Sequence, residues 1–472
     1  MVLPRSLAAW SVPGSIRARL LAGAFWSILG SGIAQAMSMA ATMLCARFLG
    51  PHHYGQLGVI QSTVNLFGLV ASLGLGITAT KHIAEHYRLD PARAGRVLGL
   101  AALTACGTGV FVAALLVAGA PWLSRTALNA PELSLDLQIA SIAIFFSAIN
   151  GYQVGALTGF EAFRPLAVAS LIRGLITLPA FVVGILAAGL RGAVVALALV
   201  SAINYLVNAL VLTRECRLRG VSVSYHLGIE DWRLLYRFSI PVVVAGMSFT
   251  PAVWWTNTLL ARASGYAQLG VFSAAFQWNT VILFFSGALG NLCLPLLSSV
   301  TTERNMAKYV RVLLANFVLT TGSALVLATP VAIGAPFVMS LYGKSFAHAD
   351  KILLLVCLAA VLTAANTSVG YAIWSLDATV SGVLLALMRG ALLVAAAYYW
   401  RSHGALGLAG SYAFMASAQT LICCGFMWWL LRRRSAQWHG PLSEPACSFL
   451  GPTNPPAEGR WREAAISIVP ER

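Results

Sequence analysis

The sequence predicts an all-α polytopic membrane protein, with twelve transmembrane helices in two pseudo-symmetric six-helix bundles around a central cavity. Three observations predict this fold: an apolar composition, long apolar runs, and a repeat that divides the chain in two. Of the 472 residues, 58% are hydrophobic and 10% are charged, whereas a soluble domain carries about 25% charge. The mean hydropathy of +0.78 agrees, so lipid is the expected surrounding of most side chains.

The apolar runs are long enough to be transmembrane helices. A span needs roughly 20 apolar residues, and a backbone in lipid must satisfy its own hydrogen bonds, which favours helices. A transmembrane β-barrel would instead show alternating segments of about ten residues. The predicted spans lie near residues 22–46, 56–80, 97–119, 138–160, 166–189, 191–213, 239–261, 269–296, 312–334, 350–374, 380–400 and 405–431.

These spans define the expected domains. The first six form an N-terminal bundle over residues 22–213, and the last six form a C-terminal bundle over residues 239–431. A short N-terminus (1–21) precedes them, and a basic linker (214–238) joins them. The tail over residues 432–472 is rich in proline, serine and charge, so we expect it to be disordered.

The positions of lysine and arginine predict the orientation. With the N-terminus inside, the inner segments hold 19 lysines and arginines and the outer segments hold 7. Since cytoplasmic loops carry the excess of such residues, both termini are expected in the cytoplasm. The net charge of +16 then reflects topology, and its spread over many loops predicts no nucleic-acid partner. The eight cysteines are scattered, which predicts small buried side chains and neither a metal nor a cofactor site.

The two halves carry the same landmarks at one spacing. Residues 46–59 read ARFLGPHHYGQLGV, and residues 261–271 read ARASGYAQLGV. Four residue pairs lie 215 or 216 positions apart: Arg47 and Arg262, Arg173 and Arg389, Asn150 and Asn366, and Glu161 and Asp377. An even number of spans separates the copies, so both cross the membrane in the same direction. Parallel repeats of this kind are a transporter architecture, with the substrate site near the midplane between the halves.

Two segments resemble a known family. Residues 45–101, CARFLGPHHYGQLGVIQSTVNLFGLVASLGLGITATKHIAEHYRLDPARAGRVLGLA, are similar to the first two spans of polysaccharide flippases. These flippases belong to the multidrug/oligosaccharidyl-lipid/polysaccharide (MOP) exporter superfamily. Residues 334–362, GAPFVMSLYGKSFAHADKILLLVCLAAVL, resemble the segment that enters the tenth span of that family. The likeness covers about residues 20–431 and excludes the tail.

The resemblance implies a function in cell-surface polysaccharide synthesis, such as O-antigen, capsule or exopolysaccharide. The implied activity is translocation of an oligosaccharide, carried on a polyprenyl diphosphate, across the bacterial cytoplasmic membrane by alternating access. It implies a transporter and not an enzyme, with no catalytic residues and no cofactor. The implied partners are the lipid-linked oligosaccharide and membrane lipid, together with polysaccharide polymerase and other export proteins.

Other functions stay open at this point. A drug or small-metabolite exporter of the same superfamily generally uses a carboxylate within the membrane, and no predicted span has one near its centre. A membrane glycosyltransferase or polymerase usually needs a constellation of charged residues on a sizeable outer loop, whereas the outer loops here are short and poor in charge. A scaffold that retains the fold without transport is a third alternative.

Two arginines within spans are the first candidates for substrate binding. Arg173 lies in the fifth predicted span and Arg389 in the eleventh. An arginine at the membrane centre costs about 2.5–3.5 kcal/mol on insertion scales, so each needs a partner or a hydrated cavity. With no acidic residue nearby in sequence, a bound anion is a candidate partner, and guanidinium binds diphosphate in a bidentate manner. The alternative is a structural arginine that extends to the interface or bonds backbone carbonyls.

Basic residues at helix ends form a second group. Arg47 and Arg262 end outer helices, where they either interact with the last carbonyls or contact the diphosphate as it leaves. Lys81 precedes Glu85 by four positions, which favours an ion pair on one helix face. The alternative for Lys81 is capture of the substrate on entry.

Polar and tryptophan side chains within spans form a third group. Such residues can line a sugar-binding cavity, or they can hydrogen-bond neighbouring helices at about 0.6 kcal/mol each. Ser38 and Thr42 share a helix face with Gln35. The candidate residues are Gln35, Gln61, Asn65, Asn150, Trp254, Asn257 and Gln277.

Overall fold

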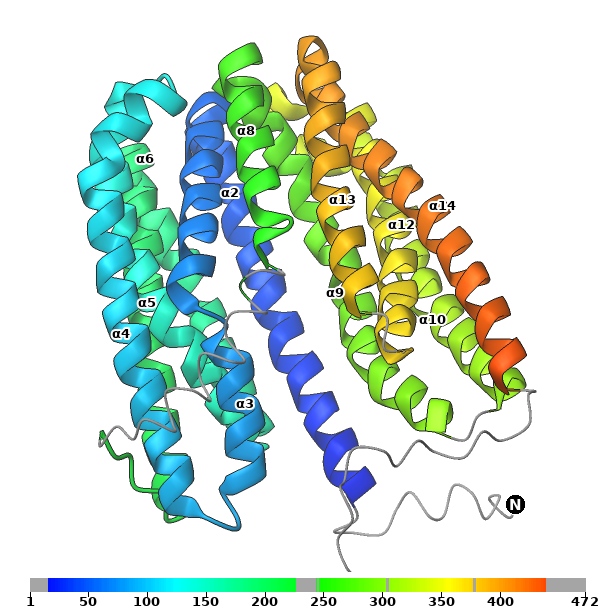
Figure 1. Ribbon diagram of the computed structural model, residues 1–472. Coiled ribbons are helices and arrows are strands. Elements are labelled where there is room, and N and C mark those ends of the chain that lie inside the picture. Colours follow the sequence, from blue (N-terminus) through cyan, green and yellow to red (C-terminus); the bar gives the residue numbers. More distant parts are fainter. Residues whose placement is uncertain (1–15, 226–242, 244–245, 303–304, 377–378, 439–472) are drawn as a thin grey trace, which may run out of the picture. The chain divides into compact units, whose positions relative to one another are not determined.

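The computed structural model describes residues 16–225, 243, 246–302, 305–376 and 379–438. All regular structure within these ranges is helical (Figure 1). Residues 1–15 of the predicted N-terminus, 226–238 of the predicted linker, Asp377 of the repeat and residues 439–472 of the predicted tail lie outside the described residues.

The first half of the described chain contains four long helices and one short one. Helices α2, α4, α5 and α6 are long, and α3 has 12 residues. Their bounds are α2 (Ile16–Ser72), α3 (Leu75–His86), α4 (Pro91–Trp122), α5 (Ser134–Gly159) and α6 (Phe163–Leu218), with single turns at η1 (Leu123–Ala127) and η2 (Pro131–Leu133). Helix α6 packs against α2 and α5, and α4 packs against α5.

The second half repeats part of this pattern, since α8 packs against α13 as α2 does against α6, and α10 packs against α12 as α4 does against α5. Helix α9 packs against α10 and α12. The bounds are α8 (Thr250–Ser264), α9 (Tyr266–Thr302), α10 (Met306–Ile333), α11 (Ala335–Ser340), η3 (Lys344–Phe346), α12 (Asp350–Ser375), α13 (Thr379–Tyr399), η4 (Arg401–His403) and α14 (Gly404–Trp438).

Two helix starts follow local sequence signals. The side chain of Asp90 accepts a hydrogen bond from the backbone N–H of Arg93 at 3.0 Å, and Pro91 occupies the first turn of α4. Asn305 caps α10 in the same way, by accepting from the N–H of Lys308 at 3.0 Å. Both positions carry the residue types that satisfy the unpaired N–H groups of a helix start.

Nine helices in the described part of the chain are long and apolar enough to cross a membrane. Two of them, α2 and α6, each correspond to two predicted spans. Helix α2 is interrupted at Gly50 (φ 70°), between the spans predicted at 22–46 and 56–80, and α6 at Ala188–Gly189, the last residues of the span predicted at 166–189. The polytopic all-α fold is therefore confirmed. The number twelve stays a prediction, because α8 begins at Thr250 and much of the span predicted at 239–261 precedes it.

Residues 1–428 form one compact unit and residues 429–472 form a second. Within the second unit, α14 continues to Trp438, past Arg432 where the sequence predicts the tail to begin. There the guanidinium of Arg433 lies 5.4 Å from the ring centre of Trp429. All features described below belong to the first unit.

The repeat seen in the sequence recurs in the geometry. Asn150 donates from Nδ2 to the carbonyl of Ser201 at 3.2 Å, and Asn366 donates to the carbonyl of Ala416 at 3.3 Å. Both bonds tie corresponding helices, α5 to α6 in one half and α12 to α14 in the other. The same glycine has the same backbone conformation in each half, Gly50 at φ 70° and Gly265 at φ 89°.

The halves meet through a reciprocal glycine contact between α2 and α9. A Cβ at Gly55 would collide with the carbonyl oxygen of Tyr266, and a Cβ at Gly270 would collide with the carbonyl oxygen of Pro51. These pairs exchange under the repeat of 215 residues, as the two sides of a two-fold contact do. Nearby, the Tyr266 hydroxyl donates to the carbonyl of Leu128 at 2.8 Å. The Pro51 end of the two halves is thus closely packed.

Candidate functional site

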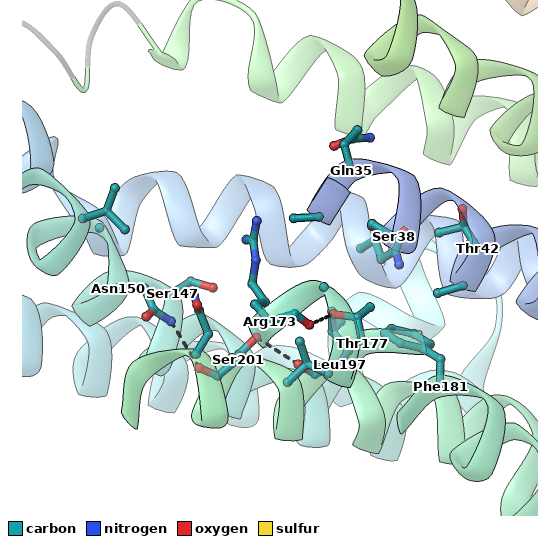
Figure 2. A pocket seen from close by; sticks show the side chains of 18 residues that line it. Gln35, Ser38, Thr42, Ser147, Asn150, Arg173, Thr177, Phe181, Leu197 and Ser201 are labelled. Atoms are coloured by element: carbon teal, nitrogen blue, oxygen red, sulfur yellow. Dashed lines mark hydrogen bonds between the residues drawn. The ribbon is translucent and has the colours of Figure 1, made fainter. Parts of the chain in front are cut away.

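A polar cavity of about 620 Å³ lies between α2, α5 and α6 (Figure 2). We call it the arginine cavity, because Arg173 is the charged residue among those that line it. Hydroxyl and amide side chains make up most of its polar lining: Gln35, Ser38, Thr42, Gln61, Ser147, Asn150, Thr177, Ser201 and Asn204. The cavity therefore combines a mixed polar and apolar lining with one positive charge.

Arg173 is held beside this cavity by close packing of its helix. The next residue, Gly174, lets α6 approach α2, since a Cβ there would lie 2.8 Å from Cα of Ala34. Figure 2 shows the Arg173 side chain extending away from α6 toward α2. No hydrogen bond or ion pair to its guanidinium occurs among the described residues. The positive charge of Arg173 therefore faces the cavity.

Asn150 lines the arginine cavity but also holds its wall together. Besides the bond to Ser201, its Oδ1 accepts a hydrogen bond from Nδ2 of Asn208 at 3.1 Å. The amide therefore has a donor and an acceptor engaged between α5 and α6. Both alternatives from the sequence, cavity lining and helix–helix contact, hold at this residue.

A second cavity, of about 370 Å³, lies between the halves. Its lining residues come from α2, α8, α9 and α14, with Phe249 just before α8, and we call it the aromatic cavity. Amides and aromatic rings line it together, including Gln61, Asn65, Asn257, Gln277, Phe249, Phe276 and Tyr412. The Oδ1 atom of Asn257 is buried and has no hydrogen-bond partner among the described residues. Gln61 lines both cavities, so they adjoin there.

Arg389 differs from its counterpart Arg173. Its guanidinium carbon lies 4.0 Å from the ring centre of Phe249, which is a cation–π distance. Its Nε is buried and has no hydrogen-bond partner among the described residues. Arg389 does not line either cavity, but Phe249 separates it from the aromatic cavity that this ring lines. The two arginines expected to act together are thus in different surroundings.

The other candidate residues lie elsewhere. Trp254 donates from Nε1 to Oγ1 of Thr63 at 3.0 Å and joins α8 to α2 rather than lining either cavity. Arg262 lines a third, shallower cavity with Arg401, and Arg47 is exposed near Gly343. Nζ of Lys81 lies 3.9 Å from Oε1 of Glu85, which is the ion pair that the spacing predicts.

Several cavity residues were not candidates in the sequence. Thr177 and Ser201 face the arginine cavity, and Phe249, Phe276 and Tyr412 face the aromatic cavity. Thr177 follows Arg173 by four positions, and that spacing could have placed it on the same helix face. Nothing in the sequence separates the aromatic residues from the many others that pack in the core.

The chain is similar to several known proteins. Residues 20–301 match the profile of the family described as polysaccharide biosynthesis protein. The lipid III flippase of Escherichia coli (strain K12) is 22% identical over 432 residues, which cover 88% of this chain and 100% of that protein. The EPS I polysaccharide export inner membrane protein EpsE of Ralstonia nicotianae (strain ATCC BAA-1114 / GMI1000) is 28% identical over 287 residues, which cover 58% of this chain and 62% of that protein.

A solved structure supports the same fold. The inward-facing conformation of a multidrug resistance MATE family transporter of the MOP superfamily superposes with a TM-score of 0.73. The sequence identity is 17%, and the match covers 87% of this chain and 99% of that one. With a family profile that covers more than half of its length, the chain belongs to the polysaccharide biosynthesis protein family and has the fold of the MOP superfamily.

Proposed function

We propose that this protein carries a polyprenyl-diphosphate-linked oligosaccharide across the bacterial cytoplasmic membrane by alternating access. It acts as a transporter without enzymatic activity, with both termini in the cytoplasm. The family profile and the relatives named as a lipid III flippase and a polysaccharide export protein support this class of substrate. The excess of lysine and arginine in the predicted inner segments supports the orientation.

The observation that carries the proposal is the cavity-facing charge of Arg173. A central arginine costs about 2.5–3.5 kcal/mol to insert, and no acidic side chain is among the described residues that line the arginine cavity. A diphosphate offers the missing negative charge and two oxygens at the spacing that a guanidinium fork recognises. The hydroxyl and amide groups around Arg173 are suited to the remaining phosphate oxygens. We therefore assign the diphosphate to the arginine cavity.

The aromatic cavity is suited to the sugars. Pyranose rings present hydroxyls at their edges and C–H groups on their faces, so they need hydrogen-bonding amides beside aromatic rings. Asn65, Asn257 and Gln277 supply the amides, and Phe276 and Tyr412 supply rings. Because Gln61 lines both cavities, a headgroup can extend from one cavity into the other with its diphosphate on Arg173.

The charge of the arginine cavity argues against export of cationic drugs. Arg173 is the charged group among the lining residues that the structure describes, and it would repel a cation in a medium of low dielectric constant. The same electrostatic interaction with Arg173 favours an anionic substrate.

The test is transport by variants of Arg173. We expect Arg173→Gln to abolish complementation of a strain that lacks its polysaccharide flippase, and Arg173→Lys to retain part of it. A hydrogen bond to a charged group contributes about 1.5–3 kcal/mol, so loss of the guanidinium should weaken substrate binding at least about tenfold. Lysine keeps the charge but loses the planar fork.

Arg125→Gln is the matched control, because Arg125 is exposed and lines neither cavity. Arg262 is unsuitable as a control because it is itself a candidate for substrate contact. The lipid-linked oligosaccharide should accumulate in the cytoplasmic leaflet with Arg173→Gln but not with Arg125→Gln, at equal amounts of membrane protein. Normal transport by Arg173→Gln would exclude the assignment of the diphosphate to this arginine.

A further inference from the structure

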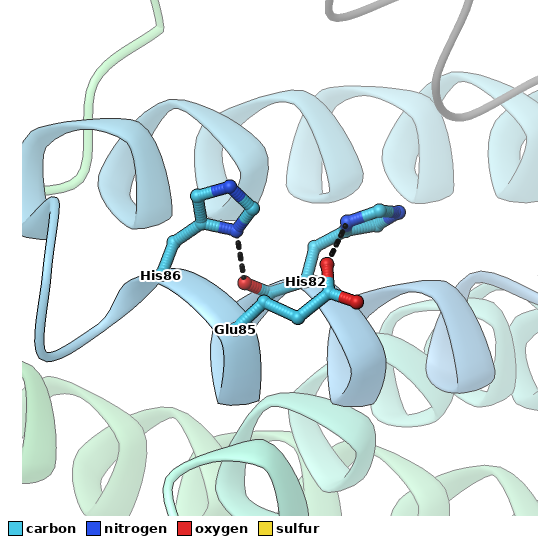
Figure 3. A group of neighbouring side chains, drawn as sticks. All are labelled: His82, Glu85 and His86. Atoms are coloured by element: carbon cyan, nitrogen blue, oxygen red, sulfur yellow. Dashed lines mark hydrogen bonds and ion pairs between the residues drawn. The ribbon is translucent and has the colours of Figure 1, made fainter. Parts of the chain in front are cut away.

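Helix α3 carries two histidines and a glutamate on one face. Residues 82–86 read HIAEH, so the two imidazoles are four positions apart and the carboxylate lies between them in sequence. Positions i, i+3 and i+4 share a helix face, and Figure 3 shows the three side chains together. One ligand atom from each of His82, Glu85 and His86 lies within 4.8 Å of the other two. From its scattered cysteines the chain is expected to hold no metal, and the histidine spacing is a separate feature.

Two of the three groups already have the separation that a bound ion requires. Nδ1 of His82 lies 3.1 Å from Oε2 of Glu85. Zinc binds imidazole nitrogen and carboxylate oxygen at about 2.0–2.2 Å, so two ligands at a tetrahedral angle are roughly 3.3 Å apart. In the structure this distance is that of a hydrogen bond, and the same two atoms can chelate an ion with little movement.

The third group has a defined tautomer, but Figure 3 shows its other ring nitrogen on the side of the ring away from Glu85, so the ring must turn to bind an ion. Nδ1 of His86 lies 2.9 Å from the carbonyl oxygen of His82. A carbonyl accepts and never donates, so the proton is on Nδ1 and the lone pair is on Nε2. Metal-binding histidines are commonly held in this manner, with one ring nitrogen donating to a carbonyl and the other binding the ion.

The surroundings leave room for entry. His82 is buried, whereas Glu85 is exposed and His86 partly exposed, so the cluster opens to solvent on the side of its carboxylate. Lys81 competes for Glu85 at 3.9 Å, with both side chains more than 40% exposed. An exposed pair of this kind contributes about 0–1 kcal/mol, so a divalent ion can replace it.

We propose that His82, Glu85 and His86 bind a divalent transition-metal ion, zinc foremost. Two imidazoles and a carboxylate favour zinc and its neighbours over magnesium or calcium, and water completes the coordination. The same H-x-x-E-H order occurs on helices of some metallopeptidases, but all three groups here come from one helix, so we propose binding and not hydrolysis. The ion would brace the last turn of a 12-residue helix, a length at which isolated helices are marginal.

Cobalt and zinc binding to the full-length protein tests this proposal without reference to transport. The protein is purified through a tag that contains no histidine and freed of metal with a chelator. We expect one Co²⁺ per chain, with the visible d–d absorption of nitrogen and oxygen coordination, and displacement of that ion by Zn²⁺. Zinc should also raise the temperature of thermal unfolding.

Variants locate the ion. His86→Gln and Glu85→Gln should each weaken zinc binding at least about tenfold, a loss that even changes in outer-shell residues can produce. His52→Gln/His53→Gln is the matched control, because it removes two neighbouring histidines whose rings are 5.5 Å apart on another helix. Absence of the absorption in the wild type, or equal binding by the wild type and both cluster variants, would overturn the proposal. Since Glu85 is exposed, Glu85→Gln stays informative if His86→Gln unfolds.

Discussion

Arg173 and Arg389 occupy equivalent positions in the two halves but have different surroundings. The first extends into a polar cavity, and the second stacks on Phe249 at 4.0 Å. A stacked guanidinium removed from water contributes about 2 kcal/mol or more, whereas one that faces a hydrated cavity contributes little to the fold. One arginine can therefore serve the substrate while the other serves the packing beside the aromatic cavity.

This difference in surroundings predicts that substitution by glutamine has a different effect at each arginine. Arg389→Gln should lower the free energy of unfolding by about 2 kcal/mol, because it removes the stacking on Phe249. Arg173→Gln should leave the free energy of unfolding nearly unchanged while it abolishes transport. Unfolding in detergent and complementation, measured on both variants, check this. An Arg389→Gln protein as stable as the wild type would show that the stacking does not stabilise the fold.

Asn150 and Asn366 provide a second residue-scale prediction. Each ties two helices through its side-chain amide, and Asn150 also accepts from Asn208. Interhelical hydrogen bonds in membranes contribute about 0.6 kcal/mol on average and at most about 1.7 kcal/mol. Leucine at either position should therefore lower the free energy of unfolding by about 0.5–1.5 kcal/mol, and more at Asn150.

Denaturation in sodium dodecyl sulfate measures these differences. Asn204→Leu is the control, because Asn204 lines the arginine cavity without a side-chain hydrogen bond among the described residues. Equal losses at Asn150 and Asn204 would mean that the bond between helices contributes nothing measurable.

The sequence identifies these residues but not their surroundings. Arg173 and Arg389 each precede a glycine within an apolar run, and nothing nearby distinguishes them. What separates them is Phe249, which lies 140 positions before Arg389 and reaches it only in the folded chain. Trp254 likewise suits a sugar in composition, but its indole N–H is taken by Thr63 from another helix. Contacts of this range depend on how helices pack, which a single sequence does not contain.

At the scale of elements, the crossing of α2 and α9 is a close backbone contact between the halves. It depends on Gly55 and Gly270, whose missing side chains let two backbones meet. Alternating access requires the halves to separate at one end while they close at the other. We expect the separation at this end to occur between these two helices.

A larger residue at this crossing should therefore shift the conformational equilibrium. Gly55→Val introduces a side chain against the carbonyl of Tyr266, so it should favour the state in which this end is open. Spin labels can be placed at positions 48 and 263, both exposed near the contact, in a background without native cysteines. Double electron–electron resonance should then show a longer distance between the labels in Gly55→Val than in the parent protein.

Gly68→Val is the control on the same helix, since a Cβ there meets no atom within 4 Å. The two variants should differ both in the distance distribution and in transport rate. Unchanged distances with Gly55→Val would mean that this crossing is not where the halves separate.

The elements themselves were largely predictable, with one systematic difference. Apolar length located the spans, but α2 and α6 each continue across the predicted break as a kinked helix. At Gly50 the backbone takes a positive φ and Pro51 restarts the helix directly, so no loop residues intervene. Composition shows where polarity rises between spans, but the bend itself depends on the conformation of one or two residues.

For the whole molecule, the repeat of about 215 residues predicted the two-part architecture. That spacing was visible because arginine and asparagine landmarks recur at it in both halves. The positions of the cavities were not predictable, because the arginine cavity is lined from the first half and the aromatic cavity from both. Approximate symmetry in sequence therefore does not imply equal sites in the two halves.

The predicted topology has a direct test. A fluorescent protein fused after Trp438, in place of residues 439–472, should fluoresce in the cytoplasm, because such reporters fold there and not after export. The truncated carrier should also keep its transport activity, since both cavities lie before residue 428. Loss of transport with normal membrane insertion would assign a function to the tail, and a dark fusion would place the C-terminus outside.

The glycine contact between α2 and α9 has a further consequence for leakage of ions. An internal two-fold axis relates the Gly55–Tyr266 and Gly270–Pro51 contacts. A rotation of the two halves that preserves this axis therefore opens both contacts by the same amount. Arrangements with one contact open and the other closed are thereby disfavoured. This end of the protein should therefore be either closed or fully open, without a populated intermediate. A carrier for a bulky headgroup that works in this way avoids partly open states, whose narrow opening would let protons through.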